Sequence, residues 1–218
     1  MKKFFITCTA IALCFVSCNN ENKKATENES DVVVADTTAT EAPEMAEEPM
    51  DSIAMQKAWE NYMTPGEPHQ WLAKEEGTWN AEMTFWMGPD APPEKANSTA
   101  NIKMILGGRY QEAVYTGEMM GMPFEGRSTI GYDNAAKKWT STWIDNMGTG
   151  IMIMNGTSED GGKTSNFEGT FVDPMTGKEK KMRETYTVVD ENTRKMEMFN
   201  QAPNGSEYKS MEILLTRK

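Results

Sequence analysis

The sequence predicts an all-β domain of about ten antiparallel strands that close into an up-and-down β-barrel, with a short N-terminal helical segment as a lid. Apolar and polar residues alternate in short, regularly spaced runs over most of residues 79–217. Turn-forming Gly, Pro, Asn and Asp residues separate these runs. Strands joined by such short turns pair antiparallel, and closing a long meander into a barrel removes both exposed edges.

The N-terminus has the pattern of a lipoprotein signal peptide, which we expect to cover residues 1–17. Positively charged Met1–Lys3 precedes an uncharged run over residues 4–16, which has the length of a secretory signal core and is too short to span a bilayer. The run ends in Phe15-Val16-Ser17-Cys18, which resembles a lipobox, although Leu is usual where Phe15 stands. An ordinary cleaved signal or an uncleaved helix is the alternative. The abrupt change to polar residues after Cys18 favours cleavage there and lipid attachment to that cysteine.

The three cysteines support export. Cys8 and Cys14 lie inside the expected signal, so the mature domain keeps no thiol besides the lipidated Cys18. This pattern suits an oxidising compartment and excludes thiol catalysis and cysteine-based metal sites. We therefore expect the protein in the cell envelope, anchored to a membrane only through its lipid and facing the periplasm or the cell surface.

Residues 18–52, with the lipidated cysteine at their start, read as a disordered acidic tether. Residues 19–52 contain ten acidic residues and two lysines, a net charge of −8 out of −11 for the whole chain, and no aromatic residue. Such a segment buries too little apolar surface to offset the entropy of ordering, which favours a solvated spacer. The alternative is a tail that binds cations or a basic partner. The acidic balance argues against nucleic acid as a partner.

The remaining residues, 53–218, suffice for one domain with its own core, and they begin with the helical lid. Asp51-Ser52 can cap a helix that has a broad apolar side, and Pro65-Gly66 ends it. A second short helical turn begins near His69 and stops at Gly77.

The alternating runs give ten predicted strands. They lie near residues 79–87, 100–106, 109–117, 123–132, 137–145, 149–156, 163–172, 178–189, 193–201 and 206–217. The interior of a barrel this wide can hold a small ligand.

Several segments together resemble domain-of-unknown-function family 1579 over about residues 63–218, in the order of that family. These segments are Pro65–Leu72, Gly77–Trp79, Gly107–Tyr110, Gly121–Gly126, Gly131–Asn134, Trp143–Gly150, Asp173–Lys178 and Met211–Lys218. The family has no agreed activity, and its members look like relatives of the lipocalin and fatty-acid-binding barrels, the calycins. By the same resemblance, Trp79 closes the barrel floor and Arg217 packs over it in a cation–π contact with a structural role.

The residues offer little support for an enzyme. His69 is the single histidine, no nucleophile motif accompanies it, and one histidine cannot anchor the usual zinc sites. We interpret His69 as a capping or packing residue, and we expect no catalytic residue, no metal site and no cofactor.

Polar residues on strand faces that otherwise read as buried are candidates for ligand binding. Trp143 and Asp145 share one face, and Arg183 lies on the face of Thr185 and Thr187. A charge inside a barrel needs a partner, so such residues either form a satisfied structural network or orient the polar end of a ligand. The candidate set is Trp143, Asp145, Arg183, Glu112, Arg127, Met152, Met154 and Glu212.

The leading hypothesis is a non-enzymatic, lipid-anchored binder of a small, mainly apolar or amphipathic ligand. The first alternative is a structural or interaction module with a filled barrel, which exposed Trp86 or Trp139 would favour. A carboxylate-based enzyme would need two cavity carboxylates with separated pKa values. With 19 methionines in the chain, soft-metal binding, as of copper, is a further alternative, and adaptable apolar lining is the commoner use of methionine.

Overall fold

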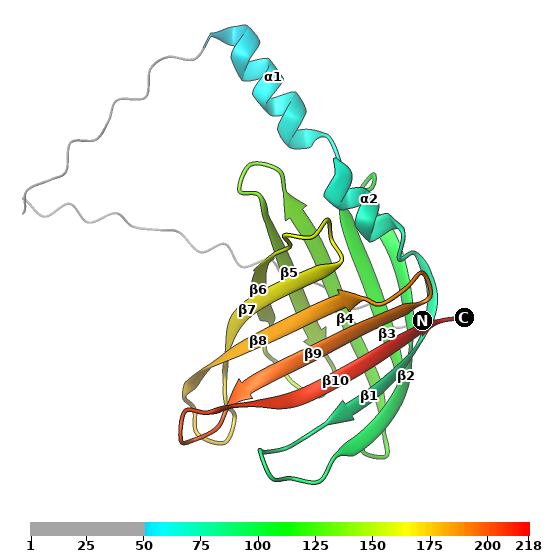
Figure 1. The fold of residues 1–218 in the computed structure, drawn as a ribbon, viewed down its shortest axis with the longest axis vertical. Coiled ribbons are helices and arrows are strands. Elements are labelled where there is room, and N and C mark those ends of the chain that lie inside the picture. Colours follow the sequence, from blue (N-terminus) through cyan, green and yellow to red (C-terminus); the bar gives the residue numbers. More distant parts are fainter. Residues whose placement is uncertain (1–50) are drawn as a thin grey trace, which may run out of the picture. The chain divides into compact units, whose positions relative to one another are not determined.

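The computed structural model describes residues 51–218, which form a closed ten-stranded antiparallel β-barrel preceded by two helices (Figure 1). The helices are α1 (Ser52–Met63) and α2 (Glu67–Ala73). The strands are β1 (Gly77–Phe85), β2 (Glu94–Ile105), β3 (Tyr110–Met119), β4 (Met122–Asp133), β5 (Lys138–Asp145), β6 (Met152–Thr157), β7 (Thr164–Val172), β8 (Glu179–Val188), β9 (Thr193–Gln201) and β10 (Glu207–Arg217). Each strand pairs with its neighbours in the sequence, and β1 pairs with β10 to close the barrel. The predicted fold class is therefore confirmed.

Along each strand, every second side chain points into the barrel. In β1, Trp79, Ala81 and Met83 are buried, whereas Asn80 and Glu82 between them are exposed. Pairing of β1 with β10 runs from Trp79 opposite Arg217 to Phe85 opposite Met211. The barrel thus has no free edge strand along which another sheet could add.

The second strand begins earlier than its sequence pattern indicated. β2 starts at Glu94, whereas the apolar alternation is clear only from Ala100. Its earlier inward positions are Ala96 and Ser98, both buried. Small and polar residues at inward positions hide the strand from a reading based on hydrophobicity.

Two buried clusters form the core of residues 51–218, which belong to one compact unit. One cluster gathers around Trp79 and Tyr115, mainly from β1, β2, β3 and β10. The other contains Trp139, Met154 and Phe167 of β5–β7 and includes Leu72 of α2. All strands and both clusters belong to this unit, so it has the core of an independently folding domain.

Of the two helices, α2 covers the barrel, and α1 does not. Leu72 and His69 of α2 are buried, and α2 contacts β2, β3 and β4. α1 has no buried residue, and its apolar side chains, among them Trp59, are exposed. Figure 1 shows α2 at one end of the barrel and α1 beyond it. The second helical turn of the sequence, and not the first, therefore provides the lid.

No helix among residues 51–218 is long and apolar enough to cross a membrane. The predicted signal peptide, Cys18 and the tether up to residue 50 lie outside the described residues.

Candidate ligand-binding cavity

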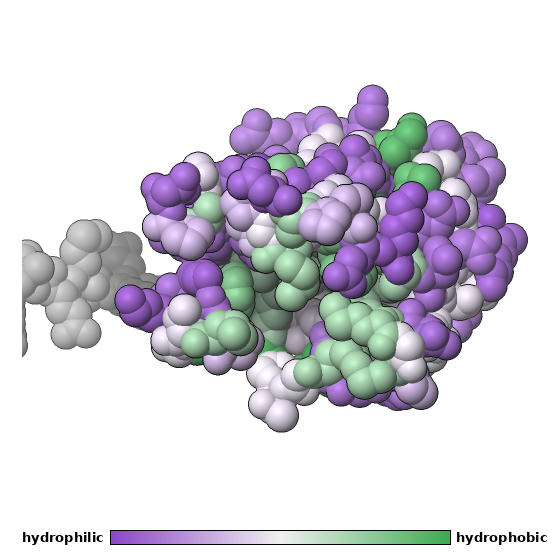
Figure 2. All heavy atoms as spheres, turned by 90° about the horizontal axis from the view of Figure 1, so that it is seen from below, coloured by the Kyte–Doolittle hydropathy of each residue, from purple (hydrophilic) through white to green (hydrophobic). Residues whose placement is uncertain are grey.

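The barrel encloses a cavity of about 580 Å³, within the range of small-molecule sites. Its wall combines aromatic side chains with unbranched, adaptable methionines. The main apolar lining residues are Met83, Phe85, Ile102, Tyr115, Met119, Ile130, Trp139, Trp143, Met152, Phe167, Met182, Met196, Met198 and Met211. Figure 2 looks at the end of the barrel away from α2 and shows it hollowed, with hydrophobic residues around and inside the opening. The barrel is closed at one end and open at the other.

Trp143 forms part of the wall toward the open end. Its indole N–H donates to Asp145 Oδ2 at 2.6 Å, and its ring packs against Tyr115 and Phe124, with centroid distances of 5.3 and 6.4 Å. The neighbouring strand leaves room through Gly126, where an added Cβ would lie 2.4 Å from the Trp143 ring. The indole therefore lies directly against the backbone of β4 and is held in one orientation.

Asp145 fixes Trp143 and the turn that follows it. Its Oδ1 accepts hydrogen bonds from the backbone N–H groups of Met147 and Gly148, at 2.8 and 3.1 Å. With Oδ2 bound to Trp143, both carboxylate oxygens are in use. Asp145 thus shapes the mouth of the cavity and has little capacity left for a ligand.

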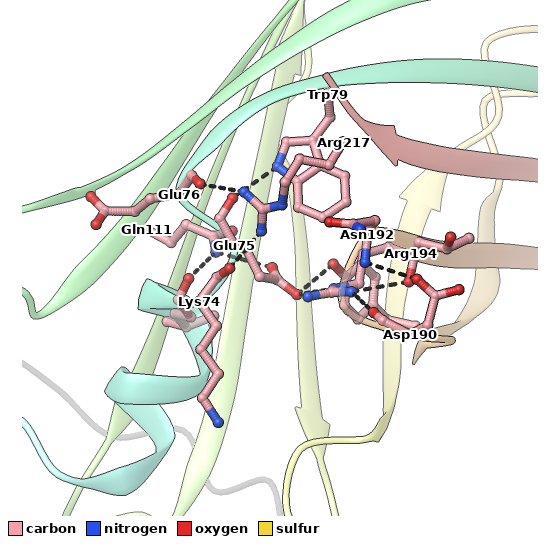
Figure 3. Close-up of polar contacts among 12 residues, drawn as sticks. Lys74, Glu75, Glu76, Trp79, Gln111, Asp190, Asn192, Arg194 and Arg217 are labelled. Atoms are coloured by element: carbon pink, nitrogen blue, oxygen red, sulfur yellow. Dashed lines mark hydrogen bonds and ion pairs between the residues drawn. The ribbon is translucent and has the colours of Figure 1, made fainter.

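Trp79 fills the closed end of the barrel between two arginines (Figure 3). Arg217 lies over its ring at 4.2 Å from the centroid, and Arg194 lies at 5.1 Å. Arg217 also donates to the backbone oxygens of Lys74 and Glu76, both at 2.7 Å. These bonds join the last strand to the segment between α2 and β1.

A buried ion pair lies beside Trp79. Glu75 Oε1 accepts from Arg194 Nε at 2.9 Å and from the Tyr186 hydroxyl at 2.8 Å, and Oε2 accepts from the Gln111 side chain at 3.1 Å. Side-chain exposure is 5% for Arg194 and 8% for Glu75. Gln111 also donates to the Leu72 carbonyl, so this network attaches α2 to the barrel (Figure 3). Burial and the Glu75 charge raise the pKa of Tyr186 well above its ordinary value, which keeps the phenol protonated as a donor.

Glu184 is the most unusual polar residue of the wall. On the inner face of β8 it lies between Met182 and Tyr186, where it lines the cavity and is 8% exposed. Among residues 51–218, no hydrogen bond or ion pair reaches its carboxyl group, and burial raises its pKa to about 7. An acid of this kind sits near half ionisation at neutral pH.

Comparison with known proteins places the chain in a family. The family model described as "Protein of unknown function (DUF1579)" matches residues 64–217. The chain belongs to the DUF1579 family. The match spans α2 and the whole barrel, and so includes the cavity and its closed end.

Among solved structures, the DUF1579 domain resembles the crystal structure of Rv2717c from M. tuberculosis, with a TM-score of 0.53 and 14% sequence identity over 71% of this chain and 99% of that chain. At this identity the likeness shows a shared β-barrel fold. A redesigned β-barrel also matches, with a TM-score of 0.35 and 15% identity over 67% of this chain and 94% of that chain. No curated protein matches the chain.

Four of the candidate residues of this DUF1579 protein lie outside the barrel, so their predicted position on an inner face is wrong. Arg183 pairs with Glu207 at 2.7 Å and lies over the Phe199 ring, and Glu112 pairs with Lys103 at 2.9 Å. Arg127 pairs with Glu125 at 3.0 Å. Glu212 binds Lys209 at 2.6 Å. On each strand the adjacent residue points inward, because a shift of one position exchanges the two faces of a strand.

The other candidates lie inside the barrel or at its closed end. Met152 lines the cavity, and Met154 is buried in the core cluster beside it. His69 is buried in α2, where Nδ1 accepts from the Gly66 N–H at 3.0 Å and the ring meets Tyr132 edge-on. Burial lowers the pKa of His69, so the neutral imidazole is favoured in this position.

Proposed function

We propose that this DUF1579 protein is a lipid-anchored envelope protein whose barrel binds a small, mainly apolar ligand without catalysing a reaction. The cavity of about 580 Å³, with its wall of methionine and aromatic side chains, is the observation that supports this proposal most strongly. Burying an apolar ligand against such a wall is favourable by about 25 cal/mol for each Å² removed from water. Methionine, which has no branch and several rotatable bonds, adapts to ligands of different shape.

The other hypotheses have less support. Trp139 is buried against Trp71 and Tyr132, and Trp86 is partly covered and lies under Lys209, so neither residue offers the exposed patch of an interaction module. A carboxylate-based enzyme needs a second free carboxylate beside Glu184. The other two carboxylates that line the cavity, Glu75 and Asp145, are occupied by hydrogen bonds. Within residues 51–218, no three His, Cys, Asp or Glu residues cluster as metal ligands would, which leaves a soft-metal site of methionine sulfurs as the metal alternative.

Filling the cavity tests the binding proposal. Ser141 of β5 lines the cavity, and its neighbour Thr140 is exposed on the outside. We expect Ser141→Phe to weaken binding of the neutral apolar fluorophore N-phenyl-1-naphthylamine at least about tenfold, because the phenyl ring occupies the space of the ligand. Fluorescence titration of wild type and variant measures the difference.

Thr140→Phe is the matched control, since it adds the same ring at the adjacent position and leaves the cavity open. It should bind the fluorophore as the wild type does. Equal binding by all three proteins would show that the fluorophore binds outside the barrel and would contradict the proposed use of the cavity.

The lipid anchor is tested by replacing the cysteine that would carry it. We expect Cys18→Ala to move the protein out of the membrane fraction and to abolish incorporation of radiolabelled fatty acid, because a durable anchor needs the acyl chains. Cys8→Ala and Cys14→Ala, within the expected signal, are the controls and should leave both properties unchanged. A Cys18→Ala protein that still incorporates the labelled fatty acid would argue against lipid attachment at Cys18.

A further inference from the structure

The ionisable groups that face the cavity differ in how well they are partnered. Glu75 and Arg194 bind each other, and both oxygens of Asp145 accept hydrogen bonds. Lys74 and Lys163 also line the cavity and are exposed to solvent. Glu184 alone among these groups is more than nine-tenths buried and has no hydrogen-bond partner within residues 51–218. Leaving a buried carboxyl unpaired costs free energy, so its retention calls for an explanation.

The surroundings of Glu184 are apolar. Its partners across the sheet are Phe167 of β7 and Met198 of β9, both buried. Tyr115 of β3 is close enough for the charge of Glu184 to raise the pKa of its phenol further, after the larger effect of burial. Among residues 51–218, no positive group forms an ion pair with the carboxylate, and a molecule that enters the cavity meets it directly.

We propose that Glu184 is the polar recognition residue of the cavity and that the ligand is an amphipathic amine, with its apolar chain against the methionine and aromatic wall and its protonated nitrogen at the Glu184 carboxylate. This proposal rests on the proposed function. A charge-assisted hydrogen bond to an ammonium group supplies the partner that the buried carboxylate lacks. An alcohol can donate a hydrogen bond but leaves the charge uncompensated.

The arrangement disfavours an anionic ligand. A fatty acid would place a second carboxylate near Glu184. Two carboxylates in one site cannot both stay ionised without a large cost, so at pH 8 binding would require the uptake of a proton. A carboxylate ligand would need a free cation inside the barrel. The guanidinium of Arg194 already donates to Glu75 and to the backbone oxygens of Asp190 and Thr193, and the other two cations of the lining, Lys74 and Lys163, are exposed to solvent. The cavity therefore favours a ligand with a positively charged head group, which lies at the unpaired carboxyl of Glu184.

The affinity for an amine should depend on pH through Glu184. The other charged or titratable residues that line the cavity are Lys74, Glu75, Tyr115, Asp145, Lys163, Tyr186 and Arg194. Burial raises the pKa of both tyrosines, so they stay neutral, and arginine stays charged. Because burial raises the pKa of Glu184 to about 7, its ionised fraction rises between pH 6 and pH 8, and the affinity for an ammonium ion should rise about tenfold.

Three probes with the same chain and different head groups test the proposal: dodecylamine, dodecanol and dodecanoate, each below its micellar concentration. Residues 19–218 contain every described residue and the whole compact unit, and allow titration without detergent. Native mass spectrometry counts bound probe, and the change in tryptophan fluorescence, to which the cavity residues Trp71, Trp139 and Trp143 contribute, gives affinities. At pH 8 we expect dodecylamine to bind at least about tenfold more tightly than the other two probes.

Glu184→Gln is the test variant and keeps the shape of the side chain. It should remove the preference for the amine and its rise with pH, and bind dodecanol at least as tightly as the wild type does. Glu168→Gln on the outer face of β7 is the control and should change neither. A preference for the amine that persists in Glu184→Gln, or equal affinities of the wild type for all three probes, would overturn this inference and leave the binding function intact. Binding of none of the probes would instead contradict the proposed function itself.

Discussion

Glu184→Gln should stabilise the protein at pH 8 by up to about 3 kcal/mol and have little effect near pH 4.5, in the absence of ligand. Burial raises the pKa of Glu184 from its ordinary 4.5 to about 7 in the folded protein. Below pH 4.5 the carboxyl is protonated in both the folded and the unfolded state. Between pH 4.5 and 7 the unfolded chain releases this proton and the folded protein keeps it, so folding stability falls as the pH rises. Above pH 7 the loss is complete, and the amide avoids it.

Urea unfolding followed by tryptophan fluorescence between pH 4.5 and 8 measures this difference. Glu168→Gln, which changes an exposed carboxylate on the neighbouring strand, should show no pH-dependent difference from the wild type. A Glu184→Gln protein that is less stable than the wild type at pH 8 would mean that the carboxylate has a stabilising partner, against the account of Glu184 as an unpaired acid.

Arg194→Met should destabilise the barrel by about 3–5 kcal/mol, because it leaves the Glu75 carboxylate buried without its cation. The variant also removes the guanidinium from the face of Trp79. It loses the hydrogen bonds that Arg194 donates to the backbone oxygens of Asp190 and Thr193. Chemical denaturation of the variant and the wild type at pH 7 measures the cost.

The exposed Arg183–Glu207 pair provides the control. Its side chains are 35% and 47% exposed, so Arg183→Met should cost no more than about 1 kcal/mol. Replacing both partners in Arg194→Met/Glu75→Gln should recover part of the loss, since no buried charge then remains. Similar costs for Arg194→Met and Arg183→Met would contradict the view that the Glu75 network attaches α2 to the barrel.

Most of the fold follows from local sequence signals. Alternation such as that of Trp79, Ala81 and Met83 identifies the strands, and the short turns between them force antiparallel neighbours. Asp145 and Trp143 could be placed on one face because they are two positions apart on a clear strand. Arg217 could be placed over Trp79 from the family resemblance, because these residues belong to the matched segments at the two ends of the barrel.

The inner charges could not be placed as well, and β8 shows why. In residues 182–188, Glu184 interrupts the apolar face of Met182, Tyr186 and Val188, and the threonines on the face of Arg183 are common in strands. The alternation is therefore weak evidence for Glu184 as the inward residue. The choice depends on pairing with Phe167 and Met198, which only the assembled barrel reveals.

Glu75 was missed for another reason. It lies in a turn without periodicity, and its partners Tyr186 and Arg194 are more than 100 residues away in sequence. The single available signal was its place beside the Gly77–Trp79 segment.

The proposed function requires that the barrel hold a small, mainly apolar ligand in its cavity. Native mass spectrometry tests it most directly, on protein purified gently from its native envelope and weighed again after denaturation. The account predicts a mass excess in the native spectrum that disappears on denaturation, with a mass and isotope pattern that separate an organic amine from another lipid or from a copper ion. A bare native mass that stays unchanged after incubation with envelope extract would contradict it and would favour the structural or interaction module.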